Sequence, residues 1–201
     1  MPDKFTEIFF ESNSHQRILL ESGRIENFSS GKLKGMGLRS IQDDFVEYTS
    51  ADSPDEARVE KECRCLGLKT PDLPAEEPPG ENLKNCLPFL SELDKKVRKE
   101  PRVIQFRLSL AWSKDSYAVS NSLERRVSWK EYFFTARAEV FLGKKGEKIS
   151  ASEVVTLREE VQRNIAEDEI KAATEKALRR ALLLSESPKA PLGNFPVVIH
   201  S

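Results

Sequence analysis

The stretch from Arg102 to Trp112, RVIQFRLSLAW, alternates between apolar and polar residues with a period of two. This alternation is typical of a β-strand with one buried face and one solvated face, because successive side chains point to opposite sides of the backbone. The stretch therefore predicts a sheet strand whose buried side consists of Ile104, Phe106, Leu108, Leu110 and Trp112.

Shorter β-rich runs fill the first fifty residues and the segment after Trp112. Turn formers such as SNS, SSGK and QDD separate the early runs. Ser22–Gly23 lies between two of them and predicts a two-residue hairpin turn. The predicted strands are Phe5–Glu11, Gln16–Glu21, Arg24–Ser29, Gly35–Ile41 and Phe45–Thr49, followed later by SYAVSNS, RRVSWKE, YFFTARAEVFLG and KISASEVVTL.

The segment after Ser53 is the first predicted helix. Ser53 can cap the helix, Pro54 suits the first helical position, and Glu56 completes an S-x-x-E capping box. Gly67 can end the helix.

Two further segments have helical periodicity. A helix is predicted over about Leu83–Lys99, in which Pro88 should cause a bend or a late start. The segment AEDEIKAATEKALRRALLL, residues 166–184, gives the strongest helical pattern. Its predicted buried stripe consists of Ile170, Ala173, Ala177, Leu178, Ala181 and Leu182.

The order of strands, helices, strands and helix indicates an α+β domain. We expect an antiparallel or mixed sheet built from hairpins, with helices packed on one face. Residues 1–195 are predicted to form a single domain with a proline-rich linker or loop at 68–81. Residues 196–201, PVVIHS, are expected to begin a further strand.

The charges of the chain nearly cancel, with 32 Lys and Arg against 33 Asp and Glu. This balance argues against a dedicated nucleic-acid binder and against a polybasic membrane-surface protein. No apolar run approaches the length of about 18 residues that a transmembrane helix needs. The N-terminus shows no secretory signal, so the predicted compartment is the cytoplasm.

The residues that could carry chemistry are sparse. Cys63, Cys65 and Cys86 are expected to be reduced thiols, because an odd number without a signal peptide does not fit a disulfide framework. His15 is placed in a turn and His200 next to the end, so neither can complete a zinc site or a nucleophile–base pair. No catalytic, cofactor-binding or metal-binding residue is predicted.

Three glycines, Gly31, Gly35 and Gly37, raise the question of a phosphate-binding loop. Such loops require a helix directly after the glycines, whereas here a strand follows. We therefore expect Gly31 to turn a hairpin, and Gly35 and Gly37 to ease the twist of the next strand or its approach to a neighbour.

The same region carries a recognisable pattern. From Leu20 to Arg39 the chain has L-x-x-G-R-I-E-x-x-S-x-G followed by G-x-G-L-R. The later segments YTSADSPDEA, residues 101–147 with the pair Asn121–Ser122, and the alanine-rich helix before APLGNFPVVI continue the likeness. Together they resemble the N-terminal domain of the TldD/PmbA family, also called modulator of DNA gyrase proteins.

The resemblance has three departures. The family usually begins with a helix before the first strand, and a glycine often follows the Asn-Ser pair, where Leu123 stands here. The third departure is that Ser201 comes before the position at which the family places its metal-binding H-E-x-x-x-H motif.

The resemblance implies the non-catalytic, substrate-groove and dimerisation domain of a zinc metallopeptidase that acts on peptides. It implies that zinc lies in a missing or partner C-terminal domain, and that this domain or a second subunit is the partner, in a homo- or heterodimer. An extended peptide would be the substrate. The alternatives are a degenerate stand-alone peptide-binding or scaffold protein without protease activity, and an independent enzyme with an unrecognised site.

Overall fold

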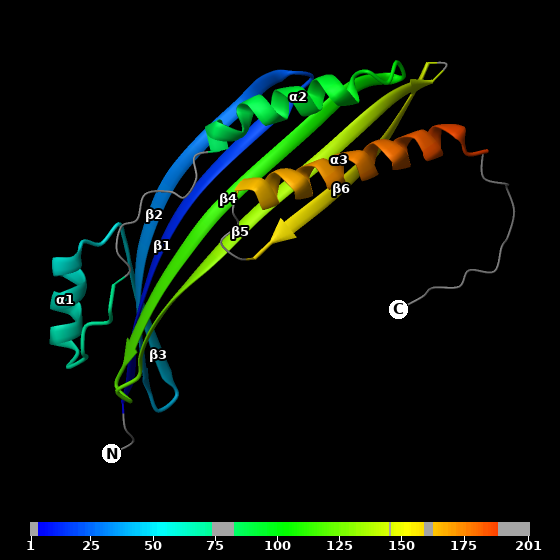
Figure 1. The fold of residues 1–201 in the computed structure, drawn as a ribbon. Helices are drawn as coiled ribbons and strands as arrows, with labels where there is room; N and C mark the ends of the chain where they lie inside the picture. Colours follow the sequence, from blue (N-terminus) through cyan, green and yellow to red (C-terminus); the bar gives the residue numbers. More distant parts are fainter. Residues whose placement is uncertain (1–3, 74–82, 145, 159–162, 189–201) are drawn as a thin grey trace, which may run out of the picture.

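The computed structural model describes residues 4–73, 83–144, 146–158 and 163–188. Within these ranges the chain forms six strands, three α-helices and one 3-10 helix (Figure 1). In chain order they are β1 (Phe5–Glu21), β2 (Arg24–Gln42), β3 (Phe45–Asp52), α1 (Glu56–Cys65), η1 (Leu83–Cys86), α2 (Leu87–Val97), β4 (Val103–Asn121), β5 (Arg126–Lys144), β6 (Glu147–Leu157) and α3 (Arg163–Glu186).

The strands form one sheet in the order β3-β2-β1-β4-β5-β6, and all neighbours are antiparallel. Each half of the sheet is a meander, and the first strands of the two halves, β1 and β4, pair at the centre. The prediction of an α+β fold with an antiparallel sheet built from hairpins is therefore confirmed.

The strands are longer than their sequences suggest. Residues 12–14 and 29–32 were expected to be turns, but β1 and β2 run through them without interruption. The prediction of a turn at SNS is wrong because this part of β1 is paired on both sides, with β2 and with β4, and the two ladders override the turn preference of small polar residues. The turn at Ser22–Gly23 is confirmed, since Glu21 pairs with Arg24.

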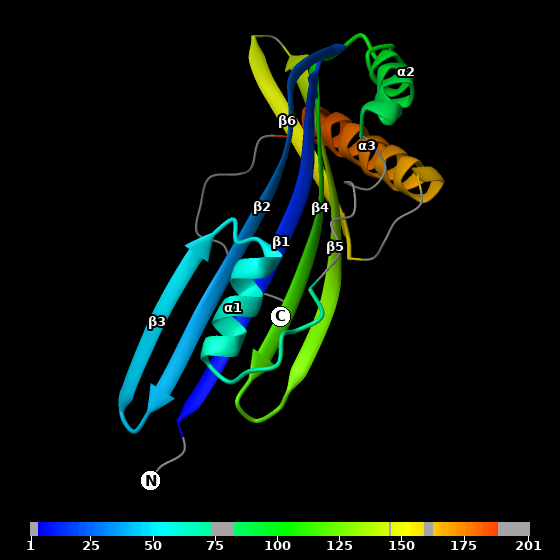
Figure 2. The ribbon, with the colours of Figure 1, turned by 90° about the vertical axis from the view of Figure 1, so that its left-hand side faces the viewer.

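One face of the sheet is covered by the helices. Ile8 and Phe10 pack in a cluster with α1, while Ile18 and Leu20 pack in a second cluster with α2 and α3. All four are even-numbered residues of a strand that keeps its register with β4, so both clusters lie on the same side-chain face. Figures 1 and 2 show α1 at one end of the long strands and α2 and α3 toward the other. The prediction that helices pack on one face is confirmed.

The start of α1 differs from its prediction. Asp55 is the N-cap, and its side chain accepts a hydrogen bond of 2.7 Å from the Arg58 amide. Ser53 lies two residues earlier with a positive φ of 48°, so the predicted Ser53 capping box is wrong. Gly67 follows the helix with a φ of 68°, as the sequence predicts for a helix end.

The second and third helices agree better with the sequence. Pro88 lies in the first turn of α2, after the short η1, which corresponds to the predicted late start. On α3, Ile170, Ala173, Ala177 and Ala181 are buried as predicted, and Thr174 is buried beside them because its hydroxyl donates to the Ile170 carbonyl at 2.8 Å. The small side chains let α3 lie close against β5 and β6.

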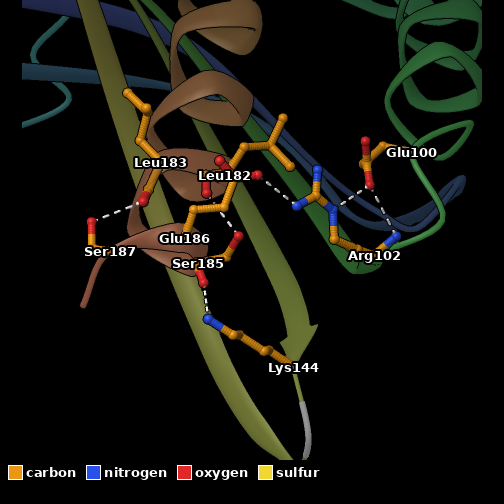
Figure 3. A network of polar contacts seen from close by, with 8 residues as sticks. All are labelled: Glu100, Arg102, Lys144, Leu182, Leu183, Ser185, Glu186 and Ser187. Carbon is orange, nitrogen blue, oxygen red and sulfur yellow. Dashed lines mark hydrogen bonds and ion pairs between the residues drawn. The ribbon is translucent and has the colours of Figure 1, made fainter. Parts of the chain in front are cut away.

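The last turn of α3 is tied to the sheet and to the loop before β4 by polar contacts (Figure 3). Lys144 donates to the carbonyl oxygen of Ser185, which places a cation at the negative end of the helix dipole. Arg102 joins Glu100 to Glu186, with nitrogen–oxygen distances of 2.7 and 3.0 Å. The long helix is thereby held at its C-terminal end as well as along its apolar stripe.

Several sequence predictions fall partly or wholly outside the described residues. Of the proline-rich segment 68–81, residues 68–73 form neither helix nor strand, and 74–81 are not described. The strand predicted at 196–201 also lies outside. Among the helices within the described ranges, none is long and apolar enough to cross a membrane.

The capping of α1 gives a direct test. Asp55→Ala should lower the free energy of unfolding by about 1 kcal/mol, since it removes the acceptor for the Arg58 amide. Ser53→Ala is the matched control and should have a smaller effect, because Ser53 does not cap the helix in this structure. Urea denaturation of the two variants would measure the difference, and a larger loss for Ser53→Ala would contradict the assignment of the cap.

Candidate functional site

The glycine-rich segment lies within β2 and not at a phosphate loop. Gly31 is in the middle of the strand, so the prediction that it turns a hairpin is wrong. A Cβ atom on Gly31 would lie 3.0 Å from the His15 ring, and one on Gly35 would lie 3.0 Å from Glu11 Oε1. The expected close approach at Gly35 is confirmed, and Gly31 has the same role: the missing side chains make room for residues of β1 that lean over β2.

His15 belongs to the exposed face of the sheet, opposite the helices. It lies in β1 and is partly buried, which corrects the prediction of a turn position. Its Nδ1 is 2.9 Å from Asn13 Oδ1, and Asn13 Nδ2 donates to Asp115 Oδ1 on β4. These bonds order polar side chains at the middle of the sheet, but they do not link His15 to a nucleophile.

The cysteines are free thiols in the structure. Cys63 is buried in α1 and Cys86 in η1, while Cys65 is exposed. Burial raises the pKa of the Cys63 thiol, which keeps it protonated and unreactive.

The family resemblance implies zinc, and the described part of the chain offers no place for it. Within the ranges that the structure describes, no three His, Cys, Asp or Glu residues come together in a way that could hold a metal ion. The side chains present there do not fit a zinc centre, so no chemical step can be assigned to metal in these residues.

The Asn121–Ser122 pair joins the β4–β5 turn to the start of β1. Asn121 Oδ1 accepts hydrogen bonds from the amides of Leu123 and Arg125, at 3.0 and 3.1 Å. Ser122 Oγ accepts from the Thr6 amide at 3.1 Å. In this chain the pair has a structural role: it shapes a turn and fixes the end of a central strand.

The Gly23–Arg24 motif forms the tip of the β1–β2 hairpin and contacts α2. Gly23 has a φ of 82°, and its amide hydrogen-bonds to the Asp94 carboxylate. Arg98 lies 3.6 Å from Asp94 Oδ2 and donates to the Ser22 carbonyl at 2.9 Å. These bonds hold the hairpin against the helix. A hollow beside this contact is lined by Glu21, Gly23, Arg24, Glu26, Ser91, Asp94, Lys95 and Arg98.

Asp94 was not singled out from the sequence. It is only 3% exposed, and its Oδ1 has no hydrogen-bond partner among the described residues. Burial raises the pKa of its carboxyl, while Arg98 and the Gly23 amide oppose that increase. Its spacing could have revealed it as a buried acidic residue, because Asp94 lies one helical turn after Leu90, on the apolar side of the helix.

The two edges of the sheet are β3 and β6, each paired on one side only within the described chain. β3 exposes large apolar side chains, with Phe45 at 79% and Tyr48 at 72% exposure. The Ser53 amide donates to the Lys34 carbonyl at 2.9 Å, so odd-numbered residues of β3 bond to β2. The amides of Val46, Tyr48 and Ser50 therefore point away from the sheet, where an added strand could bind them.

Within the described residues, a six-stranded antiparallel sheet with helices on one face and two open edges defines an α+β domain. In a comparison with family models, residues 6–64 match the model described as PmbA/TldA metallopeptidase domain 1. The recognition of the TldD/PmbA family N-terminal domain from the sequence is therefore confirmed. Comparison with curated proteins gives no match.

Solved structures share the fold over most of the chain. One is a proposed modulator of a DNA gyrase from Thermotoga maritima, with a TM-score of 0.70 and 14% identity over 94% of this chain. TldE from Thermococcus kodakarensis has a TM-score of 0.62 and 15% identity over 90% of the chain. A proposed modulator of DNA gyrase from Bacteroides thetaiotaomicron has a TM-score of 0.62 and 13% identity over 89%.

The chain spans less than half of each of these solved proteins, namely 46%, 44% and 45% of their lengths. At these identities the likeness establishes the fold. The activity and partners of the longer proteins do not follow from it.

Alanine substitution should affect stability differently at Gly23, which lies in the hairpin-tip contact, and at Gly37, which lies within β2. Gly23→Ala should lower the free energy of unfolding by about 1–2 kcal/mol, because an alanine is strained at positive φ and its Cβ would lie 3.0 Å from Asp94 Oδ2. Gly37→Ala should be neutral or stabilising by about 0.5 kcal/mol, since its Cβ would enter open space in a strand. Thermal and urea denaturation would compare them, and equal losses would contradict the proposed contact.

The buried Asp94 carboxyl predicts a pH dependence. The pKa of Asp94 is higher in the folded than in the unfolded chain, so the folded state binds this proton more tightly. The free energy of unfolding therefore decreases as the pH rises from the ordinary range of aspartate to the raised pKa. Asp94→Asn removes this titration. The free energy of unfolding of the wild type minus that of Asp94→Asn should therefore fall as the pH rises above about 4, the ordinary range of aspartate. A difference that is constant or rises with pH would contradict the assignment.

Proposed function

We propose that this chain is the N-terminal, non-catalytic domain of a TldD/PmbA-like zinc metallopeptidase that acts on peptides. In this proposal the domain forms part of the substrate groove and contributes to dimerisation, while zinc is held by a C-terminal domain or a second subunit. The observation that carries the proposal is the family match at residues 6–64, together with a fold shared over 94% of the chain with the Thermotoga maritima protein.

The β3 edge suggests how such a domain would bind an extended peptide. Its outward amides at Val46, Tyr48 and Ser50 can pair with a peptide backbone, which gives affinity without requiring a particular sequence. The exposed side chains of Phe45 and Tyr48 add apolar contacts on either side of the added strand. A peptidase that accepts unfolded segments needs recognition of this kind.

A proline on the edge provides the test. Ser50→Pro removes one outward amide and should weaken the binding of a labelled, unstructured twelve-residue peptide by about tenfold, measured by fluorescence anisotropy. Ser50→Ala keeps the amide and is the matched control. The titration is done with the chain alone and with a metal-bearing C-terminal half from a relative.

Absence of peptide binding in both titrations would overturn the proposed function. Equal weakening in Ser50→Ala and Ser50→Pro would assign binding to another surface. Circular dichroism of both variants shows that the sheet remains folded.

A further inference from the structure

Three aromatic rings from neighbouring strands form a row on the exposed face of the sheet. Tyr117 of β4 lies between Phe9 of β1 and Trp129 of β5, with ring-centroid distances of 5.8 and 4.9 Å. Trp129 is 39% exposed. The three rings occupy odd-numbered positions, whereas the residues beneath the helices are even-numbered. No helix of the described chain packs on this face.

Carboxylates surround these rings. Glu11 is directly opposite Tyr117 in the register, and Asp115 is opposite Glu131 one row further along. Trp129 Nε1 donates to Glu131 Oε1 at 3.3 Å. Burial raises the pKa of the Tyr117 phenol, and the charges of Asp115, Glu131 and Glu11 raise it further, which shows that all three carboxylates act on the same ring.

The lysines of these strand rows lie on the other face of the sheet, and the cation described over the exposed face in these rows is Arg158, which follows β6 and lies over Phe133 in the last row. Across β2, β1, β4 and β5, the exposed-face positions from Val119 to Ser113 of β4 and their partners contain no lysine or arginine. The even-numbered positions of the same rows contain Lys32, Lys34, Lys114 and Lys130. The exposed face is therefore locally acidic although the chain as a whole is nearly neutral.

A cation already lies over an aromatic ring at the border of this surface. The Arg158 guanidinium is 6.0 Å from the centre of the Phe133 ring, and Phe133 lies two residues beyond Glu131, on the same face. The geometry of the face thus accommodates a basic side chain above a ring.

We propose that this acidic aromatic patch, formed by Phe9, Glu11, Asp115, Tyr117, Trp129 and Glu131, is a docking surface for a basic segment of a partner protein. A lysine or arginine side chain would lie over the Tyr117 and Trp129 rings, where the electron-rich faces attract a cation and the neighbouring carboxylates accept its hydrogen bonds. The charge of the patch selects for basic segments and against acidic ones. The surface is a sheet face, so it is distinct from the strand edge that the proposed function uses.

A labelled twelve-residue peptide of alternating lysine, arginine and glycine is a suitable probe. It should bind the full chain in low salt, measured by fluorescence anisotropy, and binding should weaken as salt screens the carboxylates. The double variant Glu11→Gln with Glu131→Gln, and separately Trp129→Leu, should each weaken binding by about fivefold or more. A peptide of the same length with glutamate in place of the basic residues should not bind.

Glu47→Gln is the matched control, because Glu47 is an exposed strand carboxylate on the other side of the sheet. It should bind the basic peptide like the wild type, and so should Ser50→Pro, since the strand edge is not involved. The proposal is overturned if the basic peptide does not bind, if the patch variants bind like the wild type, or if Glu47→Gln weakens binding as much as they do. Loss in Ser50→Pro alone would assign the peptide to the edge.

Discussion

The ladder between β1 and β4 is the interaction on which the rest of the structure depends. Residues 7–21 pair with residues 107–121 without a break, and among the six described strands no other pair joins the two halves of the sheet. Because the register is uninterrupted, the even-numbered side chains of both strands stay on one face along their whole length. A single residue of slippage would move Ile8 and Ile18 from the buried face to the exposed one, and both hydrophobic clusters would lose their central strand.

Local patterns predicted the parts of the fold in which periodicity and burial agree. The alternation from Phe106 to Leu110, the alanine stripe of α3 and the turn at Ser22–Gly23 each correspond to the structure. The prediction that Ile104 belongs to the buried side is wrong, because Ile104 is 58% exposed at an irregularity in the β4–β5 register. The lengths of β1 and β2 could not be predicted in this way, because Ser12–Ser14 and Ser29–Lys32 have turn preferences that only pairing with distant strands overrides. The cap of α1 was missed since Ser53 and Asp55 are both good caps, and the backbone path that chooses between them is set by tertiary contacts.

The functional surfaces were less accessible to sequence reasoning. The motif from Leu20 to Arg39 identified the family, yet its residues proved to shape a hairpin tip and make room for His15 and Glu11. The row formed by Phe9, Tyr117 and Trp129 draws one residue from each of three strands that are far apart in sequence. Such a surface can be recognised only when the registers of the strands are known. Asp94 was missed as well, although its spacing after Leu90 places a charged residue on the apolar side of α2.

The central ladder also relates two similar units. β1, β2 and β3 followed by α1, and β4, β5 and β6 followed by α3, are the same succession of elements. The sheet order places the two successions outward from the β1–β4 pair, with α1 and α3 on one face and toward opposite ends. A half-turn about an axis perpendicular to the sheet at this ladder would exchange the two units in outline. The ladder is therefore the intramolecular counterpart of a two-fold dimer interface, and η1 and α2, which lie between the units in the chain, belong to neither succession.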